Sequence, residues 1–471
     1  MSSMIIKVDN QSVEFEVKQL LNSFHISDEL EIEMFRSAKD ISTIIKNDGE
    51  KLCFIEKVDD GFKETISYKK ALFKALKSIY PSSNHPWGIL TGIRPVKIAQ
   101  DLIKKNIDNI TIKKMLNEIY YISDEKIDLM LRIAKIQSKY LDDIEKSYSI
   151  YISIPFCPSR CNYCSFFSCS LDKEQNLIDP YLDSLEKELK FFYSNKVIYD
   201  KELLSIYIGG GTPSTLSINQ FQRLIKILQT YVPLKNVKEF TFEAGRPDTL
   251  DREKLEAIKM SPVTRLSINP QTMNDVTLKK IGRNHTVSDI IECFKISRDI
   301  GFDNINMDLI LGLEDESIEN ITKTLSHIKE LKPDSLTVHT LAIKKASTLI
   351  NDSQGALDKL RTYNIEDFMK ISADAADYLG MKPYYLYRQK NMLSNLENIG
   401  YALEDKISLY NIAIMEEKQT IIAFGSGSVS KFTYPEENRI ERVSNIKDVK
   451  LYIDNVEQVI AKKNKEVEKW I

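Results

Sequence analysis

The residues best suited to chemistry are a group of cysteines near the middle of the chain. Of six cysteines, four lie between positions 157 and 169, namely Cys157, Cys161, Cys164 and Cys169. The first three can supply three thiolates from a single loop. Three thiolates cannot ligate every iron of a four-iron cluster, so one iron would keep an open position, unlike ferredoxins, whose protein chain supplies every ligand. The spacing therefore predicts an iron–sulfur cluster with an open coordination position.

Other uses of these cysteines agree less well with the sequence. A disulfide framework would spread its cysteines through a small secreted chain, whereas this chain has 471 residues. A structural zinc site with Cys169 as fourth ligand is the remaining alternative, but such sites usually use two short-spaced pairs on separate turns. The five histidines are not paired at ligand spacing, so sulfur is expected to hold any metal.

Composition and charge narrow the class of protein. The length predicts two or three domains. With 65 Lys and Arg against 68 Asp and Glu, the net charge is −3, and no basic excess is available to neutralise a nucleic-acid backbone. Hydrophobic residues make up 42% and charged residues 28%, as in soluble globular proteins. No apolar run is long enough for a membrane span and no secretion signal is recognisable, so we expect a cytoplasmic location without membrane attachment.

The cysteines directly follow the first of several strands that alternate with helices. The expected strands are Ile150–Phe156, Ser205–Ile208, Glu239–Glu243, Arg265–Ile268, Asn304–Leu311 and Ser335–Leu341. The expected helices between them include Tyr181–Tyr193, Ile218–Tyr231, Arg252–Met260, Val287–Ile300 and Ile318–Leu331. This alternation implies a parallel sheet with right-handed crossovers. The predicted fold class is α/β, a partial (βα)6 barrel over residues 147–345, related to the eight-unit barrel.

In such barrels the chemistry lies at the carboxyl ends of the strands. The cysteines follow the first strand, and the glycine run 209–211 follows the second. Glu243 ends the third strand, Gln271 follows the fourth, and Asp308 lies within the fifth. Asp308 interrupts an otherwise apolar run, where a carboxylate is costly unless it is paired. The topology therefore brings these residues toward one site.

Two further regions flank the predicted barrel. Residues 1–75 alternate with period two at Met4–Val8, Ser42–Ile45, Lys51–Ile55 and Phe62–Tyr68, which predicts a small α+β accessory domain. Residues 76–146 have helical spacing and predict a connecting region. Residues 346–471 predict a mixed C-terminal region that closes the barrel, with a strand at Gln419–Phe424 and a terminal helix from about Val449.

The segment from Tyr151 to Cys164 resembles the signature of the radical S-adenosylmethionine (SAM) enzymes. It reads YISIPFC and, after a short gap, CNYC. More narrowly, residues from about 147 to 435 are similar to the oxygen-independent coproporphyrinogen III oxidase group. The stretches TGIRP at 91–95, EAGRPDT at 243–249 and PYYLYRQKNM at 383–392 resemble the longer, HemZ-type coproporphyrinogen dehydrogenases.

The resemblance implies two cofactors. A 4Fe–4S cluster would be held by Cys157, Cys161 and Cys164, and its open iron would chelate the amino and carboxylate groups of SAM. One electron from the cluster then cleaves SAM to methionine and a 5′-deoxyadenosyl radical, which abstracts hydrogen from the substrate. A low-potential electron donor such as ferredoxin or flavodoxin is the implied partner.

The resemblance also implies which residues contact SAM. Gly210, Gly211 and Thr212 lie in its GGGTP motif, where glycines let the backbone approach a ligand closely. Tyr163 matches the aromatic that lies against adenine, and Glu243 matches a carboxylate that binds the ribose or amino group. The other matches are Tyr151, Gln271, Arg283, Asp308, Ala342 and Val429. Together these residues would build two neighbouring SAM sites. Without the resemblance, a glycine run is an ordinary turn and a strand tyrosine is ordinary core.

The chain departs from the authentic oxidases of this group at three places. Ser153 stands where they have His, Phe166 where they have a further Cys, and Asn269-Pro270-Gln271 where they have Gly-Val-Gln. Phe at 166 is shared with heme-chaperone relatives. Those chaperones carry a C-terminal His-Asn pair, whose nearest counterpart here is Lys390-Asn391. Neither branch is matched in full.

The resemblance predicts oxidative decarboxylation of coproporphyrinogen III to protoporphyrinogen IX in heme biosynthesis. The alternatives are radical SAM methylation or ring opening of heme, and a non-enzymatic heme carrier that retains the cluster. The propionates of a tetrapyrrole substrate need cationic partners, for which Arg246, Arg265 and Arg388 are candidates, although each could equally be a surface or salt-bridge residue. A tyrosine cluster could flank a flat macrocycle or belong to the core, and it consists of Tyr384, Tyr385 and Tyr387.

Overall fold

The computed structural model describes residues 5–24, 26, 29–47, 49–58, 61–92, 94–165, 168–342, 365–389 and 396–471. The chain divides into two compact units. The first consists of Met1–Ala134 with Tyr387–Leu396, and the second of Lys135–Leu386 with Glu397–Ile471. Within the described residues, no helix combines the length and the apolar character that a membrane span requires.

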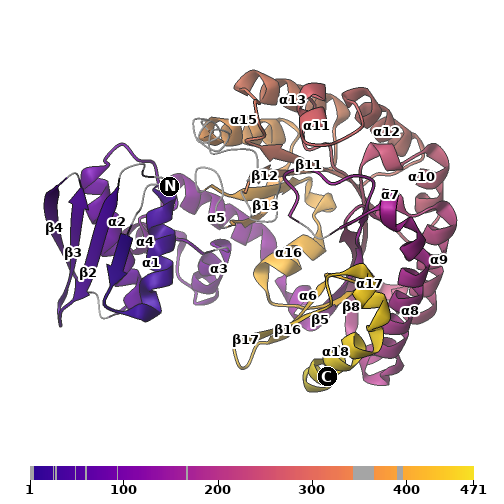
Figure 1. Cartoon of the computed structure of the whole chain (residues 1–471), viewed down its shortest axis with the longest axis horizontal. Coiled ribbons are helices and arrows are strands. Elements are labelled where there is room, and N and C mark those ends of the chain that lie inside the picture. Colours follow the sequence, from indigo (N-terminus) through magenta and orange to yellow (C-terminus); the bar gives the residue numbers. More distant parts are fainter. Residues whose placement is uncertain are drawn as a thin grey trace. The chain divides into compact units, whose positions relative to one another are not determined.

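The first unit contains a four-stranded sheet packed against two helices (Figure 1). Its elements are β1 (Ile5–Val8), α1 (Gln11–Ser23), β2 (Leu30–Arg36), β3 (Asp40–Asn47), β4 (Glu50–Lys57) and α2 (Glu64–Ile79). β1 pairs parallel with β2, and the other pairs are antiparallel. Val17 and Leu20 of α1 and Leu72 of α2 are buried in one cluster with Ile32 and Ile45 of the sheet. Three further helices follow: α3 (Val96–Lys104), α4 (Asn109–Tyr120) and the beginning of α5 (Asp124–Gln137).

The prediction of a strand at Phe62–Tyr68 is wrong. Helix α2 begins at Glu64, and its buried residues Tyr68, Ala71, Leu72 and Ala75 recur at the three- and four-residue spacing of a helix. An alternation over a few residues does not by itself distinguish a strand from the first turns of a helix. The spacing of the buried residues further along the segment shows that it is a helix.

The second unit is built on six consecutive parallel strands, which confirms the predicted partial barrel (Figure 1). They are β5 (Ser147–Ile154), β8 (Glu202–Gly210), β9 (Glu239–Gly245), β10 (Arg265–Ile268), β11 (Ile305–Leu311) and β12 (Ser335–Thr340). They lie side by side in this order. Most residues of β5, β8 and β9 are buried, as expected for parallel strands covered on both faces.

Helices connect these strands and line the outer side of the sheet (Figure 1). They are α8 (Ile178–Ser194), α9 (Ile218–Tyr231), α10 (Arg252–Lys259), α11 (Asp275–Lys280), α12 (Val287–Asp299) and α13 (Ile318–Leu331). Ser217, Thr286 and Ser317 begin α9, α12 and α13 with capping boxes. In such a box the cap side chain and the third helical residue satisfy each other's backbone N–H groups, which explains why the helices start there.

The C-terminal region extends both edges of this sheet. β15 (Thr420–Phe424) pairs parallel with β5 and continues into the antiparallel strands β16 (Val429–Tyr434) and β17 (Arg439–Ser444). At the other edge β14 (Asn398–Ala402) pairs antiparallel with β12, and β13 (Lys382–Tyr387) lies beside it. Further helices among the described residues are α6 (Leu141–Lys146), α15 (Ile365–Tyr378), α16 (Leu409–Glu416), α17 (Val449–Asp454) and α18 (Val456–Trp470).

Candidate functional site

The three predicted cluster ligands lie on the segment that follows β5. Cys157 ends the short strand β6 (Phe156–Cys157), which pairs with β7 (Cys169–Ser170) ahead of the one-turn helix α7 (Leu171–Glu174). Cys161 is buried, and Cys157 and Cys164 are half-buried. In the described part of the chain, no three His, Cys, Asp or Glu side chains already stand in an arrangement that could hold a metal ion. The three cysteines nevertheless share one segment at the carboxyl end of β5.

The surroundings of the cysteines differ in how strongly they raise the pKa of the thiol. Burial raises the pKa of Cys157, but a hydrogen bond from Thr212 and the charge of Arg246 oppose this rise. Burial and a hydrogen bond to Glu174 raise the pKa of Cys169 to about 12. Burial is the main cause that raises the pKa of Cys293 to about 12, against a hydrogen bond with Ser297 that lowers it. Since the thiolate is the metal-binding form, these surroundings favour Cys157 over Cys169 and Cys293 as a ligand.

The glycine run after β8 packs directly on the cysteine segment. The Gly211 N–H donates to the carbonyl of Ile154 at 2.9 Å, and the Thr212 N–H donates to that of Phe156 at 2.7 Å. The Thr212 hydroxyl donates to the Cys157 sulfur at 3.5 Å. A Cβ atom at Gly211 would lie 2.6 Å from the Phe156 carbonyl oxygen and 3.0 Å from the Cys157 sulfur. Only glycine therefore fits between the second strand and the cysteines.

Two acidic side chains, Glu243 on β9 and Asp308 on β11, interact electrostatically. Asn269 donates to Glu243 at 3.2 Å. Burial, followed by the negative charge of Asp308, raises the pKa of Glu243 to about 8. Burial would also raise the pKa of Asp308, but His339, whose Nε2 lies 3.7 Å from the carboxylate, and a hydrogen bond from Asn306 hold it below its usual value. One carboxyl is thus protonated near neutral pH while its neighbour is ionised.

This difference gives a testable pH dependence. Because the folded chain favours the neutral form of Glu243, its contribution to stability is present below the unfolded pKa of 4.5 and is lost as the pH rises through about 8. In Glu243→Gln this titration is absent. Thermal unfolding of both cluster-free chains between about pH 5 and about pH 8 should show the wild type losing up to about 1.4 kcal/mol per pH unit relative to the variant. A difference that stays constant with pH would contradict this assignment.

Gln271, Arg283 and Tyr163 are brought together with these carboxyls. Gln271 adopts a left-handed conformation, with φ at 68°, and its N–H donates to the Asp308 carbonyl at 2.9 Å. Its side-chain oxygen is buried and has no hydrogen-bond partner among the described residues. Arg283 donates to the Asn269 carbonyl and to the Tyr163 hydroxyl, the latter at 3.3 Å. Buried acceptors and donors that lack partners are typical of a site built to hold a polar ligand.

Tyr151 belongs to a stack of tyrosines inside the barrel. Its ring lies 6.0 Å from that of Tyr207 on β8 and 6.3 Å from that of Tyr410 on α16, and the last two rings are 4.7 Å apart. Sequence reasoning missed Tyr207 and Tyr410. Tyr207 could have been found, because period-two alternation puts it on the same face of β8 as Gly209. Tyr410 gave no such signal, since it comes from a distant helix.

Two of the predicted SAM contacts lie outside the hydrogen-bonded group described above. Ala342 is half-buried just after β12. Val429 begins β16, and 46% of it is exposed. No contact of Val429 with the carboxyl-end residues is present among the described interactions, so its assignment remains a prediction. Phe166 and Lys390-Asn391, used above to compare the chain with its relatives, lie outside the described residues.

The arginines considered for propionate binding already have protein partners. Arg246 binds Asp248 and Ser159. Arg265 starts β10, at the end opposite the cysteines, and donates to Asn304 and Ser335, so its assignment is wrong. Within the first unit, Arg388 donates to the Leu90 carbonyl and lies over the Trp87 ring. Tyr384 and Tyr385 are buried on β13, as the core alternative predicts, and Tyr387 is half-buried.

Comparisons with known proteins agree with this geometry. A family model described as the radical SAM superfamily matches residues 151–328, which contain the cysteine segment. Among solved structures, the radical SAM enzyme coproporphyrinogen III oxidase (HemN) from Escherichia coli superimposes with a TM-score of 0.50. It is 21% identical, and the match covers 69% of this chain and 71% of that chain, which shows a shared fold. The family match over residues 151–328 identifies this part of the chain as a radical SAM domain.

Related proteins show to which family the chain belongs. The oxygen-independent coproporphyrinogen-III oxidase-like protein HemZ of Bacillus subtilis is 39% identical over 413 residues, which are 86% of this chain and 81% of HemZ. The heme chaperone HemW of Lactococcus lactis is 30% identical over 323 residues, 68% of this chain and 79% of HemW. The oxygen-independent coproporphyrinogen III oxidase of Salmonella typhimurium is 30% identical over 200 residues, 42% of each chain. The chain belongs to the family of oxygen-independent coproporphyrinogen-III oxidase-like proteins that includes HemZ.

Proposed function

We propose that the chain catalyses the oxidative decarboxylation of coproporphyrinogen III to protoporphyrinogen IX in the cytoplasm. The observation that carries this proposal is the 39% identity to HemZ across 86% of the chain. The three thiols, the close glycine approach and the paired carboxyls support it because they meet at one end of the barrel. In this proposal the barrel of residues 147–345 carries the chemistry. Residues 1–75 form an accessory domain, 76–146 connect it, and 346–471 close the barrel.

The residue types present, three thiols on one loop beside a glycine run, suit the two cofactors that radical SAM proteins use. Cys157, Cys161 and Cys164 would ligate three irons of a 4Fe–4S cluster. When bound, such a cluster supplies the electron that splits SAM into methionine and a 5′-deoxyadenosyl radical. The close approach at Gly211 excludes side chains beside Cys157 and leaves backbone and hydroxyl groups to meet SAM.

The polar residues around this position would orient SAM. The protonated Glu243 can donate a hydrogen bond, and the ionised Asp308 can accept one from a ribose hydroxyl or amino group. The Gln271 side-chain oxygen offers a further buried acceptor. Tyr163, Arg283, Ala342 and Val429 complete the proposed contacts, and the family resemblance implies two neighbouring SAM sites.

On the substrate, two propionate groups would become vinyl groups. Each conversion removes one hydrogen atom, one further electron and one carbon dioxide. The hydrogen atom goes to the 5′-deoxyadenosyl radical, and the electron leaves to an acceptor outside the chain. A low-potential donor of the ferredoxin or flavodoxin class would supply the electron for each SAM cleavage.

A second candidate is a heme carrier that retains the cluster. The 30% identity to HemW over 68% of this chain supports this candidate function. The two functions differ in whether reduced protein consumes SAM and in whether heme stays bound without turnover.

Anaerobic reconstitution tests these alternatives. The reconstituted, reduced chain should form 5′-deoxyadenosine from SAM and should lose this activity when the iron is removed. Absence of SAM cleavage by a chain with an intact cluster, together with stoichiometric heme binding, would contradict the proposed reaction and support the carrier.

A further inference from the structure

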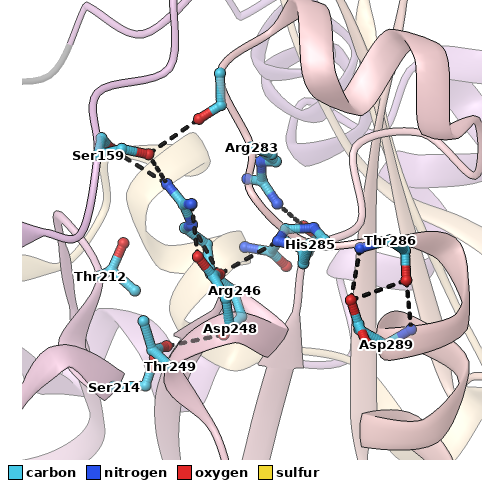
Figure 2. Close-up of polar contacts among 12 residues, drawn as sticks. Ser159, Thr212, Ser214, Arg246, Asp248, Thr249, Arg283, His285, Thr286 and Asp289 are labelled. Carbon is cyan, nitrogen blue, oxygen red and sulfur yellow. Dashed lines mark hydrogen bonds and ion pairs between the residues drawn. The ribbon is translucent and has the colours of Figure 1, made fainter.

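Ser159 lies midway between the first two cysteines of the predicted ligand set, and one buried arginine holds it. Arg246, which follows β9, donates through Nη1 to the Ser159 hydroxyl at 2.9 Å and to its carbonyl oxygen at 3.2 Å (Figure 2). Only 3% of Arg246 is exposed. A guanidinium in this position fixes both the backbone and the side chain of the residue between Cys157 and Cys161.

A carboxylate and a histidine in turn orient Arg246. Its Nε and Nη2 donate to the two Asp248 oxygens at 3.0 and 2.7 Å, a bidentate pair (Figure 2). His285 Nδ1 lies 3.2 Å from the same Asp248 carboxylate. Burial would raise the pKa of Asp248, but His285 and Arg246 hold it well below its usual range, so the carboxylate is ionised. The guanidinium therefore has one preferred orientation, with Nη1 toward Ser159.

His285 belongs to residues 280–285, the second segment that binds the cysteine loop. The Ser159 hydroxyl donates to the Gly282 carbonyl at 3.0 Å. Asn162 binds the carbonyls of Ile281 and Lys280 at 3.3 and 2.9 Å. The approach is close, because a Cβ at Gly282, whose φ is +78°, would lie 3.2 Å from the Arg160 carbonyl oxygen. Three segments, the cysteine loop, the turn after β9 and residues 280–285, thus form a closed ring of interactions.

We propose that Arg246, Asp248 and His285 are positioning residues that hold the cysteine loop in the shape that receives the cluster. Ordering a flexible backbone costs conformational entropy, and a loop that is already fixed before the cluster arrives does not lose this entropy on binding. The proposal rests on the proposed cluster site at Cys157, Cys161 and Cys164. It assigns the ring no contact with SAM or with the substrate.

We call the interactions of Arg246, Asp248 and His285 that hold the cysteine loop the clamp. Two variants test the clamp in complementary ways. Arg246→Met removes both contacts to Ser159, and Asp248→Asn keeps the size of the side chain but removes the charge that orients Arg246. In the cluster-free chain, alkylation of Cys157, Cys161 and Cys164 by a small maleimide, followed by mass spectrometry, reports how well the loop is held. In the reconstituted chain, iron release to a chelator and the electron paramagnetic resonance spectrum report the cluster. We expect both rates to rise at least about tenfold, as loss of a charge-assisted hydrogen bond predicts, and the spectrum to change.

Arg265→Met provides the matched control. Arg265 is equally buried, at 2% exposure, but its partners Asn304 and Ser335 lie away from the cysteine loop. This variant is expected to lower thermal stability without changing the spectrum or the alkylation rate per folded molecule. The proposal is overturned if Arg246→Met and Asp248→Asn keep wild-type rates and spectrum, or change only as far as Arg265→Met does at equal stability loss.

The outcome also separates this proposal from the proposed function. If the wild-type chain binds no cluster, the proposed function fails, whereas the alkylation rates of the cluster-free variants still test the clamp. If the wild type carries a cluster and cleaves SAM but the variants behave as wild type, the clamp alone fails.

Discussion

Replacing Cys161 with alanine is expected to abolish cluster assembly. Three protein thiolates already leave one iron of a four-iron cluster without a protein ligand, so loss of a second position leaves two irons exposed to exchange. Cys157→Ala and Cys164→Ala are expected to have the same effect. After anaerobic reconstitution, iron and acid-labile sulfide should fall to background, and SAM cleavage should disappear with them.

The other cysteines serve as controls for this expectation. Cys169 and Cys293 are buried thiols whose pKa is raised to about 12. Cys169→Ala and Cys293→Ala should therefore retain iron, sulfide and SAM cleavage. Loss of iron in Cys169→Ala would instead indicate a four-cysteine site and would contradict the open coordination position.

Gly211→Ala is expected to separate the glycine run after β8 from the cysteine segment. The added Cβ would lie 2.6 and 2.9 Å from the Phe156 carbonyl oxygen and nitrogen, both backbone atoms that cannot rotate away. Either the glycine run or β6 must shift, and a displacement of about 1 Å from reacting geometry costs about 100-fold in rate. The rate of 5′-deoxyadenosine formation by chain of equal iron content should fall by about this factor.

Gly92→Ala is the corresponding control for Gly211. The atom nearest to a Cβ at Gly92 is a side-chain carbon of Leu90 at 3.8 Å, which is ordinary contact. This variant should retain wild-type SAM cleavage. Unchanged activity in Gly211→Ala would show that the glycine run is an ordinary turn rather than part of the SAM site.

Local sequence signals predicted the barrel well. Arg265–Ile268 was expected as a strand and is β10, and the expected strand Ser335–Leu341 is β12 with one residue fewer. Buried parallel strands are short, apolar and separated by long amphipathic helices, so each can be recognised within its own window. The cysteines and glycines are equally local, since their spacing along the chain is part of the motif.

Features that depend on distant pairings escaped prediction. β15 joins the sheet beside β5, which precedes it by more than two hundred residues. Neither segment contains a local signal that identifies its partner strand. Arg265 was considered a substrate ligand because its type fits a carboxylate, yet its strand position places it at the other end of the barrel. The ring at Ser159 was missed for the same reason. Arg246 and His285 acquire their roles only where separate turns meet.

Product analysis after anaerobic turnover tests the central claim most directly. Reconstituted chain, SAM, a low-potential reductant and coproporphyrinogen III are incubated, and porphyrin products, carbon dioxide and 5′-deoxyadenosine are quantified. The proposed reaction predicts protoporphyrinogen IX with two vinyl groups, two carbon dioxide molecules for each product molecule, and consumption of SAM. Intact coproporphyrinogen III alongside active SAM cleavage would contradict this reaction and would direct the search to another tetrapyrrole substrate.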